Sequence, residues 1–403
     1  MAVGLNAPES LMAVAGVRLA VAAAGIRYRN RNDVVLIELA RGSETAVVFT
    51  QNKFCAAPIQ VAKTHLTQAP TRYLLINAGN ANAGTGSAGI EDAKSSCGLV
   101  AGLADVVPES VLPFSTGVIG ERLPLDRLSG ALPDLLRQLT TDAWLDAART
   151  IMTTDTLPKG ASRRVELSGG VVTITGIAKG AGMICPNMAT MLGFIATDAL
   201  VDPQQLDALL VDLAEESFNC ITIDGDTSTN DACVLIATGA SEVRPMLVAD
   251  AARFRAALRE IFLELSHAIV RDAEGANKFI TLRVEQARTY QEAKAVAYTV
   301  AHSPLVKTAL YASDPNWGRI LAAVGRAPVV DLAMQRIDIW LGAEPLIVAG
   351  EPAMSYTEAK GQAVVQQPEI QIRIALGRGD AAATVWTSDL SHEYVSVNAS
   401  YRS

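Results

Sequence analysis

Short runs of apolar residues, separated by turn residues, fill the first third of the chain and predict strands. Residues 34–39, 45–49 and 73–77 each form such a run, rich in Val, Ile, Leu or Phe, which is typical of strands. A loop of Ala, Gly and Asn residues follows at 78–84, and a helix is expected from Ile90. This part is therefore expected to form strands joined by loops and short helices.

Two long helices are predicted in the middle of the chain. The first begins at Asp202-Pro203, where Asp caps the helix, Pro takes its first position and Gln205 is placed to close a capping box. The second begins near Asp250. In both, apolar residues recur at helical spacing and predict core faces rather than a cofactor site; they are Leu206, Leu209, Leu210 and Leu213, and Phe254, Leu258, Ile261, Phe262 and Leu265.

Alternating apolar residues at 370–376 predict a further strand near the C-terminus. Gly377-Arg-Gly-Asp380 supplies a turn and 381–387 a second strand, so we expect a hairpin. Strands and helices in this order predict an α/β fold (α+β layered), with mixed, largely antiparallel sheets sandwiched by helices.

Composition narrows the class of protein. The chain has 403 residues, 50% hydrophobic and 19% charged, which is typical of a compact globular protein with room for two lobes. The net charge of −8 argues against nucleic acid as a partner. The longest apolar stretch, 11–26, contains Arg18 and is too short for a membrane span. No positive charges precede an apolar signal region, so we expect a cytoplasmic protein.

Cysteine and histidine spacing gives no metal signal. The five cysteines show no CxxC pattern and the four histidines share no motif, so reduced thiols that pack in the core are expected and a zinc site is not. Gly84-Thr-Gly-Ser-Ala-Gly89 fits GxGxxG but starts several residues after its strand, which weakens a dinucleotide interpretation. The loop from Asp224 begins like a calcium loop but lacks the required Gly and Glu, so a hydrogen-bonded turn is expected.

One central stretch indicates covalent chemistry. A glycine-rich segment from Lys179 runs into Pro186-Asn187, Ala189 then precedes Thr190, and a strand-like apolar run follows. This layout would let the chain cut itself before Thr190, although such a loop is otherwise only a connection. An N-terminal threonine carries its own base, because its α-amino group, with a pKa of about 7.7–8.0, lies next to the hydroxyl.

This stretch resembles the processing site of the ornithine acetyltransferase (ArgJ) family of arginine biosynthesis, which cleaves between Ala and Thr. Further motifs of that family occur in the same order along nearly the whole chain, and several long motifs are far more specific than one short one. They are Asn77-Ala-Gly-Asn-Ala-Asn-Ala83, Ile223-Asp-Gly-Asp-Thr-Ser-Thr-Asn-Asp231, Asp314-Pro-Asn-Trp-Gly-Arg319 and the closing Val397-Asn-Ala-Ser-Tyr-Arg-Ser403.

The resemblance implies roles for individual residues. Thr116 and Gly117, otherwise part of a plain turn, correspond to the family's oxyanion hole, which needs donors aimed at a developing negative charge. In the stretch Thr153-Thr-Asp-Thr156, Thr156 is favoured as a substrate contact, with Thr154 as the alternative. Lys179 corresponds to a lysine that binds the amino-acid substrate, where a cation suits an α-carboxylate.

Three more substrate contacts follow from the resemblance. Glu274 matches an acidic residue suited to a substrate ammonium group, and Asn398 and Ser403 of the closing motif are expected to reach the active site. The chain departs from the family pattern around Glu274 at Ala273 and Asn277, which puts fine substrate preference in doubt.

The activity implied is transfer of an acetyl group from N-acetylornithine to glutamate through an acetyl-Thr190 intermediate. The expected products of self-cleavage are chains 1–189 and 190–403, which co-fold, with a possible smaller C-terminal lobe at about 281–403. The family further implies an ArgJ/DmpA-like fold, an α2β2 heterotetramer, and acetyl-CoA as a possible second donor, with no metal or other cofactor. The alternatives are a self-processing amidase or aminopeptidase, and an uncleaved nucleotide-binding protein.

Overall fold

The chain folds into two compact units in the computed structural model, which describes residues 2–27, 29–185 and 191–400. We call the unit built from Ala7–Asn219 and Asp226–Ile269 the large unit. The small unit is built from Met1–Asn6, Cys220–Gly225 and Val270–Ser403. Each unit has its own sheets and its own hydrophobic core.

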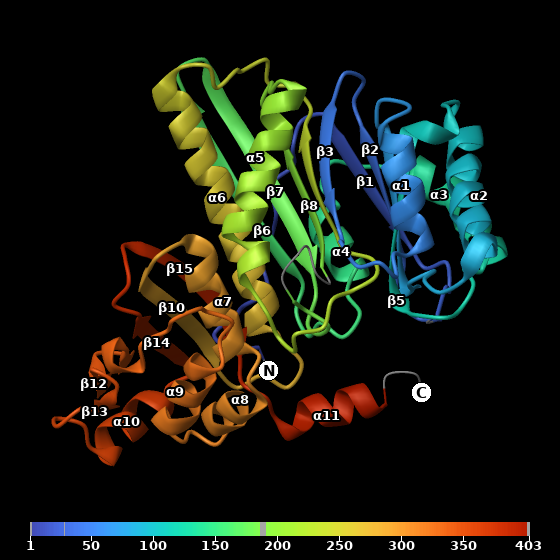
Figure 1. Ribbon diagram of the computed structural model, residues 1–403. Coiled ribbons are helices and arrows are strands. Elements are labelled where there is room, and N and C mark those ends of the chain that lie inside the picture. The colour runs from blue at the N-terminus through green and yellow to red at the C-terminus, as the bar shows by residue number, and fades with distance from the viewer. Residues whose placement is uncertain (1, 28, 186–190, 401–403) are drawn as a thin grey trace. The chain divides into compact units, whose positions relative to one another are not determined.

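Two sheets packed face to face form the middle of the large unit (Figure 1). The core between them takes apolar side chains from both sheets, and the rings of Phe114 and Phe194 meet edge to face with centroids 5.3 Å apart. The first sheet has the order β1 (Val17–Ala22), β2 (Val34–Leu39), β4 (Tyr73–Asn80), β5 (Val111–Val118). The second has the order β3 (Glu44–Phe49), β9 (Ala232–Ala237), β8 (Leu192–Thr197), β7 (Gly170–Lys179), β6 (Lys159–Leu167).

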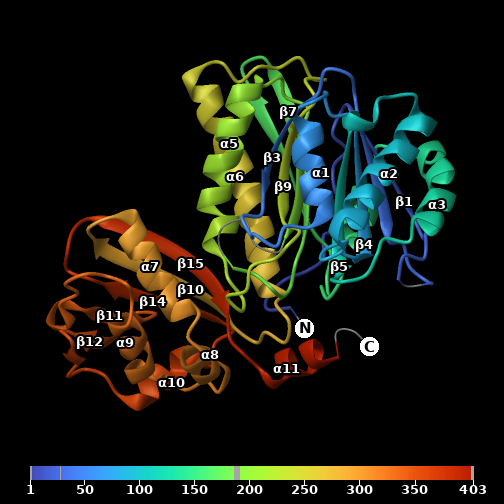
Figure 2. The ribbon, with the colours of Figure 1, turned by 45° about the vertical axis from the view of Figure 1, so that its right-hand side comes forward.

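Helices cover the outer faces of both sheets (Figures 1 and 2). Two of them, α2 and α3, pack against the outer face of the first sheet in a second core, while α5 and α6 lie on the second sheet. A Cβ added to Gly176 of β7 would lie about 3.0 Å from Leu265 and 3.1 Å from Ile261, both on α6. The large unit thus has four layers; its helices are α1 (Ala57–Leu66), α2 (Gly86–Ala104), η1 (Pro108–Ser110), α3 (Leu125–Arg137), α4 (Trp144–Thr150), α5 (Pro203–Glu216) and α6 (Val248–Arg271).

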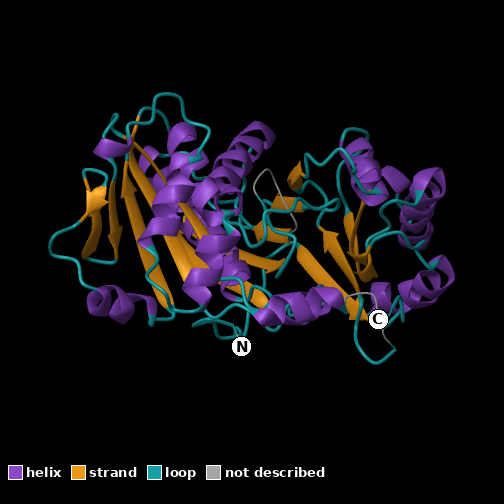
Figure 3. Cartoon of the chain, turned by 60° about the horizontal axis from the view of Figure 1, so that its bottom comes forward, coloured by secondary structure: helices purple, strands orange, loops and turns teal. Residues whose placement is uncertain are grey.

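One mixed sheet with helices over it forms the small unit (Figure 3). Its strand order is β13 (Glu351–Pro352), β12 (Glu344–Val348), β11 (Asp338–Leu341), β14 (Glu369–Ala375), β10 (Phe279–Ala287), β15 (Ala381–Ser388). Its helices are α7 (Tyr290–Ala301), α8 (Pro304–Tyr311), α9 (Trp317–Gly325), η3 (Met334–Arg336), α10 (Glu358–Val365) and α11 (His392–Ala399). Antiparallel pairs predominate in all three sheets, which confirms the predicted fold class.

The predicted hairpin of residues 370–376 and 381–387 is wrong. Both segments are strands, β14 and β15, but β10 lies between them, parallel to β14 and antiparallel to β15. The turn joining them passes over the end of β10, where the N–H groups of Arg378 and Gly379 donate to the Gln286 carbonyl at 2.8 and 3.1 Å. An alternating pattern predicts a strand but not its partner.

The predicted capping box of α5 is also absent. Asp202 precedes the helix as expected, but its side chain makes no capping hydrogen bond and instead pairs with Arg244 at 3.0 Å. The other predicted elements form, with small shifts: β4 extends to Asn80, and α2 begins at Gly86. The core faces of α5 and α6 are buried as predicted, although Leu209 is only partly buried.

Candidate functional site

The pair Thr116-Gly117 lies near the end of strand β5, where the backbones of β4 and β5 approach closely. Gly117 has a φ of +132°, and a Cβ added to it would lie 2.2 Å from the carbonyl carbon of Gly79 on β4. Because no side chain fits there, glycine is required at 117 for steric reasons alone. The backbone of Gly117, next to Thr116, is therefore held in place by its close packing against β4.

Side-chain amides hold the residue before Thr116. The Ser115 hydroxyl donates to Asn77 Oδ1 at 2.6 Å, and Asn230 Nδ2 donates to the carbonyls of Ser115 and Ala81 at 3.0 and 2.7 Å. Asn77 and Asn230 are buried. In the sequence both stand only as parts of longer motifs; Asn77 directly follows an apolar run, whereas Asn230 ends a polar stretch that precedes one.

Lys179 ends strand β7 and points its ammonium group at two threonines. Its Nζ donates to Thr153 Oγ1 at 2.7 Å and to Thr116 Oγ1 at 3.3 Å, and the residue is only 5% exposed. The structure thus brings two of the predicted site residues, Lys179 and Thr116, into contact. The sequence-based prediction within this motif was Thr156, with Thr154 as the alternative, and it did not single out Thr153.

A buried carboxylate, Asp155, lies behind Lys179. Its Oδ1 accepts from Lys159 Nζ at 2.6 Å and from the Gly180 N–H at 2.7 Å, and its Oδ2 accepts from the Thr153 N–H at 3.0 Å and lies 4.0 Å from Lys179 Nζ. Burial by itself raises the pKa of this carboxyl group, but the cations of Lys159 and Lys179 outweigh it and hold the pKa well below its usual range. Asp155 therefore stays ionised and fixes the backbone at Thr153, whose hydroxyl contacts Lys179, and at Gly180, which follows Lys179.

Asp155→Asn should destabilise the protein by about 3–5 kcal/mol at neutral pH, because it removes the buried carboxylate that pairs with the Lys159 ammonium group at 2.6 Å. Since the pKa of Asp155 is lowered on folding, its stabilising contribution is complete at neutral pH. It is lost as the pH falls below the unfolded value of about 3.9. Urea unfolding at several pH values measures both effects.

The matched control for this prediction is Asp146→Asn. Asp146 pairs with Arg149 at 3.2 Å, but both side chains are 58% exposed, so its removal should cost less than about 1 kcal/mol. Equal unfolding midpoints for the two variants would contradict the role given to Asp155.

The predicted cut lies in the connection between β7 and β8. Ala189 and Thr190 fall outside the described residues, but the chain is described again from Met191, which is buried and whose carbonyl accepts the Ala232 N–H at 3.1 Å. From there β8 runs between β7 and β9, with Leu192 opposite Lys179 in the register. Met191, which follows Thr190 in sequence, is thus held at the start of the central strand of the second sheet.

The remaining predicted residues divide between the units. Thr156 is exposed in the large unit. Glu274 and Asn398 belong to the small unit and contact each other, with Asn398 Nδ2 donating to Glu274 Oε2 at 2.6 Å. Ser403 lies outside the described residues.

The glycine-rich loop that resembles a dinucleotide site is packed against its own side chains. A Cβ added to Gly89 would lie 1.8 Å from the Thr85 hydroxyl oxygen, and that hydroxyl donates to Asn82 Oδ1 at 2.8 Å. The glycine is therefore explained by the local turn. In the described part of the chain, no group of three or more His, Cys, Asp or Glu side chains is arranged to hold a metal ion.

Among the described residues, no helix is both long and apolar enough to cross a membrane.

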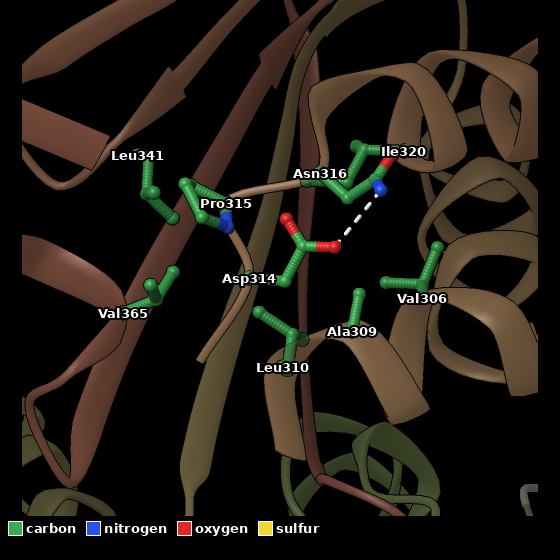
Figure 4. Close-up of a pocket in the computed structure, with 9 residues that line it drawn as sticks. All are labelled: Val306, Ala309, Leu310, Asp314, Pro315, Asn316, Ile320, Leu341 and Val365. Carbon is green, nitrogen blue, oxygen red and sulfur yellow. Dashed lines mark hydrogen bonds between the residues drawn. The ribbon is translucent and has the colours of Figure 1, made fainter. Parts of the chain in front are cut away.

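The motif around Asp314 borders a small cavity in the small unit (Figure 4). Its volume of about 10 Å³ is at the lower limit for a single water molecule. There Asn316 Nδ2 donates to Asp314 Oδ2 at 3.0 Å, and Asn316 caps α9, so this motif stabilises a helix start.

The comparisons with known proteins all point to the same family. A family model described as the ArgJ family matches residues 18–403. The arginine biosynthesis bifunctional protein ArgJ of Methylococcus capsulatus is 56% identical over 395 residues, which cover 97% of this chain and 96% of that protein. The protein of the same name from Pseudomonas fluorescens is 55% identical over 405 residues, covering 100% of both.

A solved structure is also similar over part of the chain. The crystal structure of the arginine biosynthesis bifunctional protein ArgJ from Bacillus halodurans is 37% identical, with a TM-score of 0.48, and the match covers 50% of this chain and 95% of that one. The family model and the two relatives each span almost the whole chain. The chain belongs to the ArgJ family.

Proposed function

We propose that this enzyme of arginine biosynthesis transfers an acetyl group from N-acetylornithine to glutamate, after cutting itself between Ala189 and Thr190. The observation that carries the proposal is the contact of Lys179 with the hydroxyls of Thr116 and Thr153. It places a cation and hydroxyl groups at the end of the strand from which the chain leads to Ala189-Thr190. Membership of the ArgJ family supports the reaction.

In the first half-reaction, the Thr190 hydroxyl attacks the acetyl carbonyl of N-acetylornithine. The α-amino group of Thr190 accepts the hydroxyl proton as a general base. The Thr116 hydroxyl and the Gly117 N–H stabilise the oxyanion. The C–N bond of the amide then breaks, ornithine takes the proton from the α-amino group and leaves, and an acetyl ester remains on Thr190.

In the second half-reaction, the amine of glutamate attacks that ester. Its proton passes through the α-amino group to Thr190 Oγ1 as the ester bond breaks, which restores the threonine and releases N-acetylglutamate. Ping-pong kinetics follow from the covalent intermediate. The acetyl group moves between two amines, so the overall exchange consumes no oxidant, reductant or nucleotide; acetyl-CoA remains a possible second donor.

The substrate contacts proposed from the motifs are compatible with the charges of the site. Lys179 offers a buried cation for a substrate carboxylate, with Thr156 as a hydroxyl partner. In the small unit, Glu274 is a carboxylate for a substrate ammonium group, and Asn398, already bonded to Glu274, supports it. Ser403 completes the proposed set.

The two products of cleavage, 1–189 and 190–403, are proposed to stay together in one cytoplasmic α2β2 assembly. Six residue pairs between β7 and β8 join the chain on either side of the cut. Because β8 is an inner strand of its sheet, the second chain cannot leave without breaking that sheet. The smaller C-terminal lobe, which we propose at about residues 281–403, is part of the second chain.

Intact mass and N-terminal sequencing of the denatured protein test the proposal, together with the partition of acetyl groups between glutamate and water. We expect two chains, one starting Thr-Met-Leu-Gly, and transfer to glutamate in preference to water. A single chain in an active preparation contradicts the mechanism. Acetyl transfer mainly to water would instead make the enzyme a self-processing amidase.

A further inference from the structure

Lys307, on helix α8 of the small unit, is a buried lysine for which the reaction above has no use. It is only 4% exposed, and burial of an ammonium group is costly unless acceptors surround it. Its Nζ donates to Thr387 Oγ1 at 3.0 Å and to the Ser388 carbonyl, while its own carbonyl accepts the Leu390 N–H at 3.4 Å. Lys307 therefore anchors the end of β15 and the start of the connection to α11.

The charges around Lys307 keep it protonated at neutral pH. Burial lowers the pKa of Lys307 to about 8, and the carboxylates of Asp389 and Asp224 oppose that shift. His302 is also close to Lys307: burial first, then the cations of Lys307 and Arg326, lower the pKa of His302 to about 4. Lys307 is thus the cation of a buried cluster whose imidazole is neutral at pH 7.

Asp389, next to the anchored Ser388, holds the loop that carries Glu274. Its Oδ1 accepts the N–H groups of Asn277 and Lys278 at 2.8 and 3.0 Å, and Asp389 is buried. The corner fixed by Lys307 is therefore hydrogen-bonded to backbone only three and four residues after Glu274.

Helix α11 packs against the same loop. Gly275 has a φ of +68°, and a Cβ there would lie 2.4 Å from the Ser391 hydroxyl oxygen, which caps α11. At the other end of this helix, Asn398 donates to the Glu274 carboxylate. In between, the Tyr394 hydroxyl donates to Asp224 Oδ2 at 3.2 Å. Figures 1 and 2 show α8 and α11 as neighbours.

Two routes thus lead from Lys307 to Glu274, one through Asp389 and the loop, the other through α11 and Asn398. We propose that Lys307 is a positioning residue for substrate binding, which orients the Glu274 carboxylate by anchoring the corner between β15 and α11. This inference rests on the proposed role of Glu274. Lys307 itself touches no substrate.

The first test is Lys307→Met, which keeps the length of the side chain and removes the ammonium group. We expect KM for glutamate and for N-acetylornithine to rise about tenfold or more, with kcat within about threefold, because uniform binding is lost rather than transition-state binding. Self-cleavage should be complete. An unchanged KM overturns the inference.

Arg378→Met is the matched control. Arg378 is another cation of the small unit, and its side chain is only 5% exposed. Its Nε donates to Glu292 Oε1 at 2.8 Å and its Nη2 to the Val330 carbonyl at 2.8 Å. Its loss should lower Tm in a similar way but leave KM within about twofold of wild type. An equal rise of KM in both variants would mean that loss of any buried cation disturbs binding, and it overturns the specific role of Lys307.

A double-mutant cycle with Glu274→Gln separates the inference from the proposed function. If Lys307 acts through Glu274, the effects of Lys307→Met and Glu274→Gln on KM are not additive, as expected for coupled residues. Glu274→Gln with a raised KM but additive effects overturns the inference alone. Glu274→Gln with an unchanged KM overturns the binding role of Glu274, and the inference with it.

Thr387→Val provides a milder second variant should Lys307→Met fail to fold. It removes one acceptor of the Lys307 ammonium group in a buried, nearly isosteric change, and we expect KM to rise about threefold. Hydrogen exchange of the same protein should increase at residues 274–278 and 389–399 and stay unchanged in β11. Uniform exchange changes across the small unit, with no change in KM, overturn the proposal.

Discussion

Replacing Thr190 by alanine should give a single uncut chain of 403 residues with no measurable acetyl transfer. The variant removes the Thr190 hydroxyl, which we propose as the nucleophile in acetyl transfer. The same hydroxyl belongs to the residue at the proposed cut, so cleavage should fail as well. Loss of a nucleophile that acts together with its base lowers kcat by roughly 10⁴-fold or more. Intact mass measures the cleavage, and release of ornithine from N-acetylornithine measures the transfer.

Two variants serve as controls for Thr190→Ala. Thr190→Ser keeps a hydroxyl beside an α-amino group, so it should still be cut and still transfer acetyl groups, more slowly. Cys185→Ala removes the nearby thiol, which we expect to be a packing residue, and should leave both steps intact. A processed and active Thr190→Ala protein would rule out the proposed nucleophile, and an inactive Cys185→Ala protein would direct attention to the thiol.

The sequence predicted most elements of the fold because their patterns are local. The apolar runs of β2 and β3 and the apolar faces of α5 and α6 can each be recognised within one short segment of the sequence. Partners are not local. The separation of β14 from β15 by β10 and the pairing of Asp202 with Arg244 depend on residues far along the chain, and no pattern within the predicted hairpin or helix start could reveal them.

The candidate site shows the same division. The motifs named Thr116, Lys179, Glu274 and Asn398, and the structure brings them together in pairs, Thr116 with Lys179 and Glu274 with Asn398. Asp155 was overlooked as a charge partner because Lys179 lies on a strand 24 positions later in sequence. Its pairing with Lys159 at i and i+4 was the one local signal available, and in a non-helical segment that spacing carries little weight.

Thr116→Ala should slow acetyl transfer by about 10²–10³-fold in kcat, the usual cost of removing one oxyanion donor. The argument depends on which way the hydroxyl points. Because Thr116 Oγ1 accepts a hydrogen bond from the Lys179 ammonium group at 3.3 Å, its own proton is directed elsewhere and can be donated to the oxyanion. An ammonium donor also polarises the hydroxyl and strengthens that bond.

Thr116→Ser keeps this donor and should retain most of the activity, whereas Thr141→Ala, an exposed threonine of the same unit, should behave as wild type. Active sites must be counted by the acetyl burst, so that incomplete self-cleavage is not mistaken for slow turnover. Lys179→Met distinguishes two roles of that cation. If Lys179 only binds a substrate carboxylate, KM rises and kcat is kept; if it also polarises Thr116, kcat falls as well, and the fall is absent when Thr116 is already alanine. Unchanged turnover in Thr116→Ala would leave the stabilisation of the oxyanion to Gly117 and to Lys179 acting without Thr116.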